Sequence, residues 1–275
     1  MLKMLNSLKI AGMQMLRLLF LLLLSLVMTG ASQPEGSQYE PKEQSQAKIT
    51  FFNLADGEAT LLQTDRKKYY LINTGEHDSY KQLIEELERF DVKTIEGIIL
   101  TGQTNDYCGN MNKLIEQYQA EKIYHTGTIQ TNCQPEADVT TTTWKEDDEV
   151  HLDGISVKVI FTDEEKMALH LSFYETGVIF FAKGDVEEEI HITKKSLPPF
   201  QILKIGEYGT GNAPTEQFLE KTDPHLAVIF TRKGSSMNDG LIERMHGFWM
   251  DVYRLQQTGT TTIEMDKDQY NVPSD

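Results

Sequence analysis

Acidic side chains that could hold a cation or a polar ligand occur soon after apolar runs of this chain. Asp106, Asp185 and Glu207 each follow a run with the composition of a strand. Carboxylate oxygens suit hard cations such as Mg²⁺, Ca²⁺ or Mn²⁺ better than zinc. Carboxylates on separate loops are also commonly helix caps or solvated turns, so a metal site is the weaker of the two interpretations.

Histidine, the common nitrogen ligand of zinc, is not arranged for zinc binding. The seven histidines form no His-x-His or His-x-x-x-His pair. A hydrolytic zinc site needs three or more ligands and an open position where a bound water ionises near pH 7. The histidines therefore supply no zinc centre of that kind.

The segment 98–110 runs from an apolar strand into a polar turn and then a helix. It resembles the metallo-β-lactamase superfamily, whose junction reads Thr-His-x-His-x-Asp-His-x-Gly-Gly around two metal ions. Three residues match that pattern, namely Thr101, Asp106 and Gly109. The histidine positions hold Gly102, Thr104 and Tyr107. The resemblance thus implies the fold and argues against its usual chemistry.

Further segments fall in the family's order, at 51–59, 70–75, 177–185 and 203–210. Asn73 stands where the family has Asp, and Asp185 keeps the metal-bridging carboxylate. The last segment is similar to Lys-Val-x-His-His-Gly-Ser, with Glu207 and Tyr208 in place of both histidines. That motif is typical of the extracellular C-terminal domain of competence-type DNA-uptake channel proteins and its free-standing relatives. The resemblance covers Ile49 to Met265.

The pattern of elements agrees with the α/β fold that the resemblance implies, an αββα sandwich in a single domain of residues 48–266. Strands are expected at 48–53, 59–64, 69–73, 97–101, 122–125, 155–161, 169–174, 177–182, 201–205, 226–230, 251–254 and 260–265. The threonine run 140–143 indicates a further strand edge. Four helices are expected. The first spans 80–90 and is capped by Asp78–Ser79, and the second begins at Asn110 or Asn112. The third has Pro214 in its first turn, and the fourth follows Asp239.

The resemblance predicts a vestigial site at one edge of the sandwich. Its residues are Gly102, Thr104, Asp106, Tyr107, Asp185, Glu207 and Tyr208. We interpret the chain as a non-catalytic binding or interaction module without a cofactor, whose cleft suits a cationic or hydroxyl-rich ligand. Alternatively, Tyr107 and Tyr208 only fill the space left by metal and imidazole. A second alternative is an extracellular metal-dependent hydrolase of phosphodiester or similar bonds, phosphodiesterase or nuclease-like, with a divalent cation held by Asp106, Asp185 and Glu207.

The N-terminus has the features of a secretory signal peptide. Lys3, Lys9 and Arg17 precede the apolar run 18–28, and small residues end at Ala31. We expect a signal at 1–31, a flexible polar linker at 32–47, a polar tail at 267–275 and a secreted product. The apolar run is shorter than the ~18 residues expected of a spanning helix, so no membrane span should remain. An uncleaved signal that anchors the chain is the alternative.

The charge of the chain bears on its partners. The net charge is −16, and basic residues form only short clusters at 66–68 and 194–195. Nucleic-acid binding proteins carry a basic stripe, so the acidic balance argues against that partner class. An unidentified small molecule or protein remains. We interpret the acidic runs 85–88 and 187–189 as solvated helix faces.

Two cysteines, Cys108 and Cys133, occur in a chain addressed to an oxidising exterior, and an even count there favours a disulfide. In the family's arrangement both lie at the same edge of the sheet. The alternatives are two free thiols, or Cys108 as a ligand.

The first prediction concerns export. The secreted protein should begin near Ser32, because the basic segment and short apolar run precede a site that signal peptidase accepts. Mass analysis of protein from the culture medium measures this. A full-length chain recovered only with membranes would contradict cleavage and support the anchored alternative.

Overall fold

The computed structural model describes residues 46–273, so the expected signal and most of the linker lie outside the described residues. The strands are β1 (Ala47–Phe51), β2 (Thr60–Gln63), β3 (Tyr69–Ile72), β4 (Gly97–Ile99), β5 (Lys122–His125), β6 (Thr140–Thr143), β7 (Glu149–Leu152), β8 (Ile155–Thr162), β9 (Met167–Phe173), β10 (Thr176–Phe180), β11 (Ile202–Lys204), β12 (Leu226–Ile229), β13 (Asp251–Arg254), β14 (Thr261–Met265) and β15 (Tyr270–Asn271). The helices are α2 (Tyr80–Arg89), α3 (Asn105–Cys108), α4 (Met111–Tyr118), α5 (Val186–Thr193), α6 (Glu216–Thr222), α7 (Asp239–Gly247) and α8 (Leu255–Thr258), with 3₁₀ turns η1 (His77–Ser79), η2 (Thr131–Cys133) and η3 (Gly206–Gly209).

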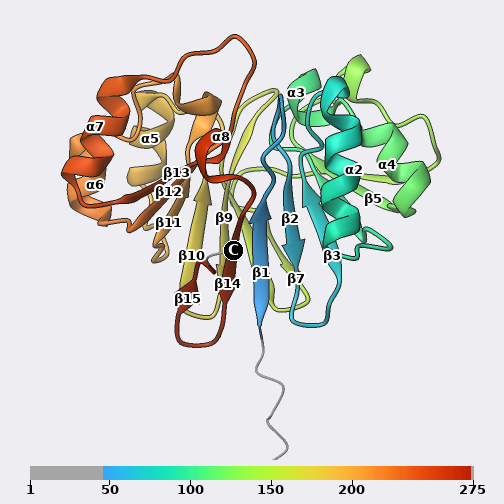
Figure 1. The fold of residues 1–275 in the computed structure, drawn as a ribbon, viewed down its shortest axis with the longest axis horizontal. Coiled ribbons are helices and arrows are strands. Elements are labelled where there is room, and N and C mark those ends of the chain that lie inside the picture. Colours follow the sequence, from blue (N-terminus) through green and yellow to red (C-terminus); the bar gives the residue numbers. More distant parts are fainter. Residues whose placement is uncertain (1–45, 274–275) are drawn as a thin grey trace, which may run out of the picture. The chain divides into compact units, whose positions relative to one another are not determined.

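Two mixed sheets face each other and helices cover their outer faces, which confirms the expected αββα sandwich (Figure 1). One sheet has the order β15-β14-β1-β2-β3-β4-β5-β6, and the other β13-β12-β11-β10-β9-β8-β7. Helices α2 and α4 lie on the first sheet, and α5, α6 and α7 on the second (Figure 1). None of the helices within residues 46–273 is long and apolar enough to cross a membrane.

Three hydrophobic cores correspond to these layers. The central core lies between the sheets and includes Phe51, Leu169 and Phe180. The other two lie between each sheet and its helices. Strand β12 is buried along its whole length, as expected for a parallel strand covered on both faces.

Parallel pairing gathers the loops that follow the strands. Strands β3, β4 and β5 are parallel neighbours in one sheet, and β10, β11, β12 and β13 in the other. Their carboxyl ends lie along the upper edge in Figure 1. Side chains far apart in sequence are therefore placed together there.

Every strand in the predicted list is present, with each end within two residues of the predicted position. Strands β7 and β15 were not predicted, because each ends a sheet and neither is buried enough to show an apolar run. Helix α2 begins at Tyr80 as expected, but the predicted side-chain cap of α2 and the predicted first-turn position of Pro214 are wrong. The Ser79 hydroxyl donates to the Asp56 carbonyl instead of capping α2, and Pro214 precedes α6, whose N-cap is Thr215.

The acidic run 187–189 is not a solvated helix face, which corrects that interpretation. Glu188 and Glu189 are buried on α5. The Glu188 carboxylate accepts backbone N–H groups from Ala182, Lys183 and Gly184 at 2.7–2.9 Å. The run looked solvated because it consists of charged residues. Burial is tolerated because the carboxylate replaces water with three donors from the loop after β10.

Cys108 at the end of α3 and Cys133 in η2 form a disulfide in the structure, with their Cα atoms 5.5 Å apart. The bridge ties the helix after β4 to the loop after β5. Of the alternatives left open by the sequence, the structure has the bridged one.

The second prediction is that this disulfide contributes substantially to stability. The Cys108→Ser/Cys133→Ser variant should lose about 3 kcal/mol of unfolding free energy, because the bridge closes a loop with a sequence separation of 25 in the unfolded chain. Urea unfolding under oxidising conditions measures it. Wild-type protein should lose a similar amount on reduction, and two free thiols in unreduced, denatured protein would contradict the bridge.

Candidate functional site

Asp106 is the centre of a hydrogen-bond network at the upper edge. The residue is only 4% exposed. The Thr104 hydroxyl donates to Oδ1 at 2.5 Å, the Tyr208 phenol donates to Oδ2 at 2.6 Å, and an Arg232 guanidinium nitrogen lies 3.4 Å from Oδ2. Both carboxylate oxygens are thus engaged by the protein's own donors.

Two buried tyrosines fill the space between the loops. The Tyr107 ring lies directly against Gly102, where an added Cβ would approach ring atoms to 2.8 Å. The ring centroids of Tyr107 and Tyr208 are 6.5 Å apart. Burial, assisted by the nearby carboxylates of Glu58 and Asp106, raises the pKa of both phenols far above the ordinary value. Both tyrosines stay protonated at neutral pH and are poor metal ligands.

The backbone around Tyr208 is strained. Glu207 has φ 45° and Tyr208 has φ 57°, so two consecutive non-glycine residues adopt the left-handed conformation. Strain of this kind persists only where surrounding contacts enforce it. Both residues of this turn have such contacts, since the Tyr208 phenol donates to Asp106 and Glu207 pairs with Lys166.

A buried ion pair lies beneath this network. Lys204 Nζ lies 2.6 Å from Glu58 Oε2, and both side chains are 1% exposed. Lys204 also donates to the Phe181 carbonyl at 3.2 Å. Burial raises the pKa of Glu58, and the Lys204 ammonium opposes that rise. Glu58 lies in the loop between β1 and β2 of the first sheet, and Lys204 is the last residue of β11 in the second sheet. The ion pair therefore joins the two halves of the sandwich.

A second cation neutralises Glu207. Lys166, from the hairpin between β8 and β9, forms an ion pair with that carboxylate and lies 5.6 Å from the centroid of the Tyr107 ring. Burial is the main cause that lowers the pKa of Lys166, and Lys204 nearby adds to it.

Asp185 has a different role from the one the resemblance implied. Its side chain caps α5 by accepting the Glu188 N–H at 2.7 Å, and Lys183 lies 4.0 Å away. None of these partners belongs to the network around Asp106. The structure brings Asp106, Tyr107, Glu207 and Tyr208 together with Gly102 and Thr104, and uses Asp185 as a helix cap.

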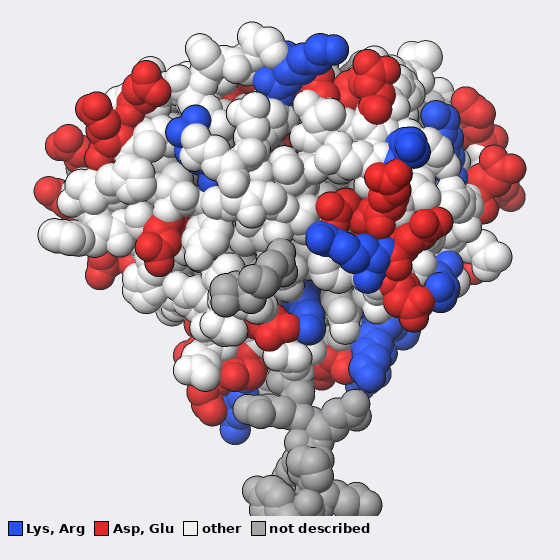
Figure 2. Space-filling model, in the orientation of Figure 1, with Lys and Arg blue, Asp and Glu red and all other residues white. Residues whose placement is uncertain are grey.

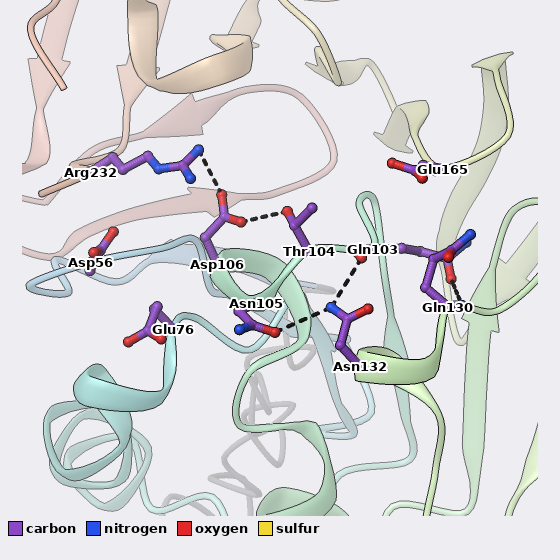
Figure 3. A pocket seen from close by; sticks show the side chains of 10 residues that line it. All are labelled: Asp56, Glu76, Gln103, Thr104, Asn105, Asp106, Gln130, Asn132, Glu165 and Arg232. Carbon is purple, nitrogen blue, oxygen red and sulfur yellow. Dashed lines mark hydrogen bonds and ion pairs between the residues drawn. The ribbon is translucent and has the colours of Figure 1, made fainter. Parts of the chain in front are cut away.

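An open cavity of about 460 Å³ lies outside this network (Figure 3). It is lined by Asp56, Glu76, Gln103, Thr104, Asn105, Asp106, Gln130, Asn132, Glu165 and Arg232. Figure 3 places Glu165 and Arg232 above the loop of 103–106, with Asp56 and Glu76 to one side. Four carboxylates, four amides and one guanidinium offer donors and acceptors for a polar ligand, with excess negative charge. Of the predicted site residues, only Thr104 and Asp106 line this cavity.

The fold's usual zinc ions do not fit these residues. Position 102 offers no side chain, Thr104 and Tyr208 donate their protons to Asp106, and Tyr107 occupies the adjoining space. Each of three carboxylates in this network already has a cation beside it. Arg232 lies beside Asp106. Lys204 pairs with Glu58, and Lys166 pairs with Glu207. Within residues 46–273, no group of three or more His, Cys, Asp and Glu is placed to hold a metal ion.

Sequence reasoning missed the residues that complete this site, namely Glu58, Lys166, Lys204 and Arg232. The sequence could have indicated a buried charge at Lys204, because a lysine within the apolar run 202–205 must bury its ammonium group or distort the strand. A buried lysine requires an acid nearby, but the sequence does not say which of 42 acidic residues provides it.

Solved structures share this fold. YhfI from Bacillus subtilis, described as a metallo-β-lactamase fold protein, matches 77% of this chain and 96% of its own with a TM-score of 0.55 and 11% identity. A variant of the CmlA β-hydroxylase matches 80% of this chain and 54% of its own, with a TM-score of 0.57 and 10% identity. A metallo-β-lactamase from Cronobacter sakazakii matches 50% of this chain and 59% of its own at 16% identity and a TM-score of 0.42, too low to carry an argument.

These comparisons show that the two sheets and their helices have the metallo-β-lactamase fold, and at such low identity they show the fold alone. This chain spans little more than half the length of the CmlA and Cronobacter proteins. No protein-family model and no curated protein sequence matches the chain.

The third prediction concerns the buried pair. Lys204→Met should lower the free energy of unfolding by about 3–5 kcal/mol, because Glu58 is left buried without a counter-charge. The pKa of Glu58 is then raised further above its unfolded value, so the folded state prefers the protonated form. The destabilisation caused by Glu58 should be smallest below about pH 4.5 and should grow as the pH rises through its folded pKa.

Chemical unfolding between pH 4 and 8 measures this effect. A Lys204→Met/Glu58→Gln double variant should recover part of the stability and lose the added pH dependence. Lys48→Met is the matched control, because it breaks a half-exposed ion pair with Glu264 and should cost about 1 kcal/mol or less. Equal losses for the two single lysine variants would contradict the role given to Lys204.

Proposed function

We propose that this chain is an exported, non-catalytic binding module of the metallo-β-lactamase fold. One observation supports the non-catalytic role most: side chains of the chain itself fill the position where the fold's relatives hold metal. Tyr208 donates to Asp106, and Tyr107 packs against Gly102. An arrangement that leaves no open coordination position does not generate a metal-bound hydroxide.

The alternative, a hydrolase with a carboxylate metal site, has weaker support. Asp106 is engaged by three donors, Asp185 caps α5, and Glu207 pairs with Lys166. A cation bound by all three would have to displace each of these partners. Export is proposed from the N-terminal residues, and the disulfide between Cys108 and Cys133 is consistent with it.

The cavity beside Asp106 is the proposed binding surface. Its amides, from Gln103, Asn105, Gln130 and Asn132, can pair with hydroxyl or amide groups of a ligand. The carboxylates of Asp56, Glu76 and Glu165 outnumber the single guanidinium and favour a positive charge. The chemistry fits a hydroxyl-rich ligand that carries an amino group.

The fourth prediction tests this ligand chemistry with glucosamine, compared with glucose. Glucosamine should give saturable shifts of backbone amide NMR signals in 103–106 and 130–132, and glucose should bind more weakly. Glu165→Gln should weaken glucosamine binding about two- to fivefold, because it removes one exposed counter-charge. Glu164→Gln is the matched control: it is exposed on the same hairpin, does not line the cavity, and should leave the affinity unchanged.

Metal analysis and an activity assay of the wild-type protein test the absence of catalysis. Protein purified without chelators should hold no stoichiometric zinc, and added Zn²⁺ or Mn²⁺ should not produce hydrolysis of bis(p-nitrophenyl) phosphate. Finding ~1 or 2 zinc ions per chain that are lost on Asp185→Ala would overturn the proposal and favour the hydrolase. Shifts that do not saturate with glucosamine, or that are identical in Glu165→Gln, would contradict the proposed ligand chemistry.

A further inference from the structure

A second cavity, of about 600 Å³, lies on the other side of Arg232. The loop after β12 forms most of its wall, with Thr231, Lys233, Ser235 and Ser236, and Arg254 at the end of β13 closes it. Hydroxyl groups and cations therefore share one concave surface. This composition differs from that of the acidic cavity beside Asp106.

The charge of this second cavity is opposite to that of the chain. Arg232, Lys233 and Arg254 line it against a single acid, Asp239, in a protein of net charge −16. Figure 2 shows Lys and Arg side chains at the upper rim of the molecule, where Figure 1 draws the loop between β12 and α7. A local positive potential on an acidic protein selects anions that the rest of the surface repels.

Two of these cations form no ion pair among the residues that the structure describes. Among residues 46–273, no carboxylate pairs with the side chain of Lys233 or Arg254. Arg254 is half-buried, and its Nε is a buried donor without a hydrogen-bond partner. The buried hydroxyl of Thr231 also has no partner. Cations without an ion-pair partner that line one concave surface attract an anion, and an oxyanion in the cavity would supply the missing counter-charge.

Arg232 separates the two cavities and is held in place. Its guanidinium carbon lies 5.4 Å from the Tyr208 ring centroid, and one nitrogen lies 3.4 Å from Asp106. The Lys233 N–H is 3.4 Å from the Asp56 carboxylate, which fixes the start of the loop to the rim of the first cavity. The basic cavity is thus built on the same rigid network as the acidic one.

We propose that the second cavity binds an oxyanion, the carboxylate or phosphate group of a ligand, through Arg232, Lys233 and Arg254. Guanidinium groups pair with planar or tetrahedral oxyanions through two parallel N–H donors, and the serine hydroxyls supply further donors. This site goes beyond the proposed function, since it requires neither the glucosamine-type ligand nor the first cavity.

The test is a titration of the full exported chain with inorganic phosphate and, separately, acetate at constant ionic strength. We expect saturable shifts of the backbone amide signals of 231–236 and of the Arg254 Nε–H signal. Arg254→Gln should weaken binding at least about tenfold, because a charge-assisted bidentate partner is lost. Lys233→Gln should weaken it about threefold. Tighter phosphate than acetate identifies a phosphate-type ligand, and the reverse order a carboxylate.

Arg66→Gln is the matched control, because its exposed guanidinium pairs with Asp153 away from the cavity and its loss should leave the affinity unchanged. Lys233 is exposed, so its variant decides the matter if Arg254→Gln does not fold. The inference is overturned if neither anion gives saturable shifts. It is also overturned if Lys233→Gln binds as tightly as the wild type, as the control Arg66→Gln should. Failure of glucosamine to bind leaves this outcome unaffected, so the two proposals fail separately.

Discussion

The ion pair between Glu58 and Lys204 is the interaction on which the site depends. Both side chains are 1% exposed, so neither charge is compensated by water. Each therefore depends on the other for its counter-charge in the core. The backbone of Glu58 is also fixed on both sides, because its N–H donates to the Asp106 carbonyl at 3.0 Å and its carbonyl accepts the Gly75 N–H at 2.8 Å. The pair therefore sets how closely the two sheets approach at this edge.

The glycine before Glu58 follows from the same constraint. Gly57 has φ +85°, and a Cβ there would lie 2.5 Å from the Asp106 carbonyl oxygen. Only glycine permits this close approach of the two loops. Once the loops are fixed, Asp106 faces Tyr208 and Arg232, and the left-handed turn at Glu207 and Tyr208 is held by that contact. The space between these loops is thus filled by side chains of the protein itself.

Because side chains fill the interior, the polar groups that a ligand can reach are those that line the two cavities that share Arg232. One is rich in carboxylates and amides, and the other in cations and hydroxyls. Because both are walled by loops fixed at strand ends, their opposite charges lie on a rigid edge of the sandwich. The loops at this edge present polar groups from fixed positions, which is the physical basis of the binding role we propose.

The sequence alone determined the elements and the fold, because apolar runs alternate with helical patterns and five motifs fall in a family's order. It also identified Asp106, Tyr107, Glu207 and Tyr208 as neighbours, since each follows a strand of that fold. It could not identify Glu58 as the partner of Lys204, or the capping role of Asp185, or the burial of Glu188. These three features depend on which groups lie close together in the folded chain. A buried charge pairs with the opposite charge that is near it in space, and only the tertiary structure decides which residue that is.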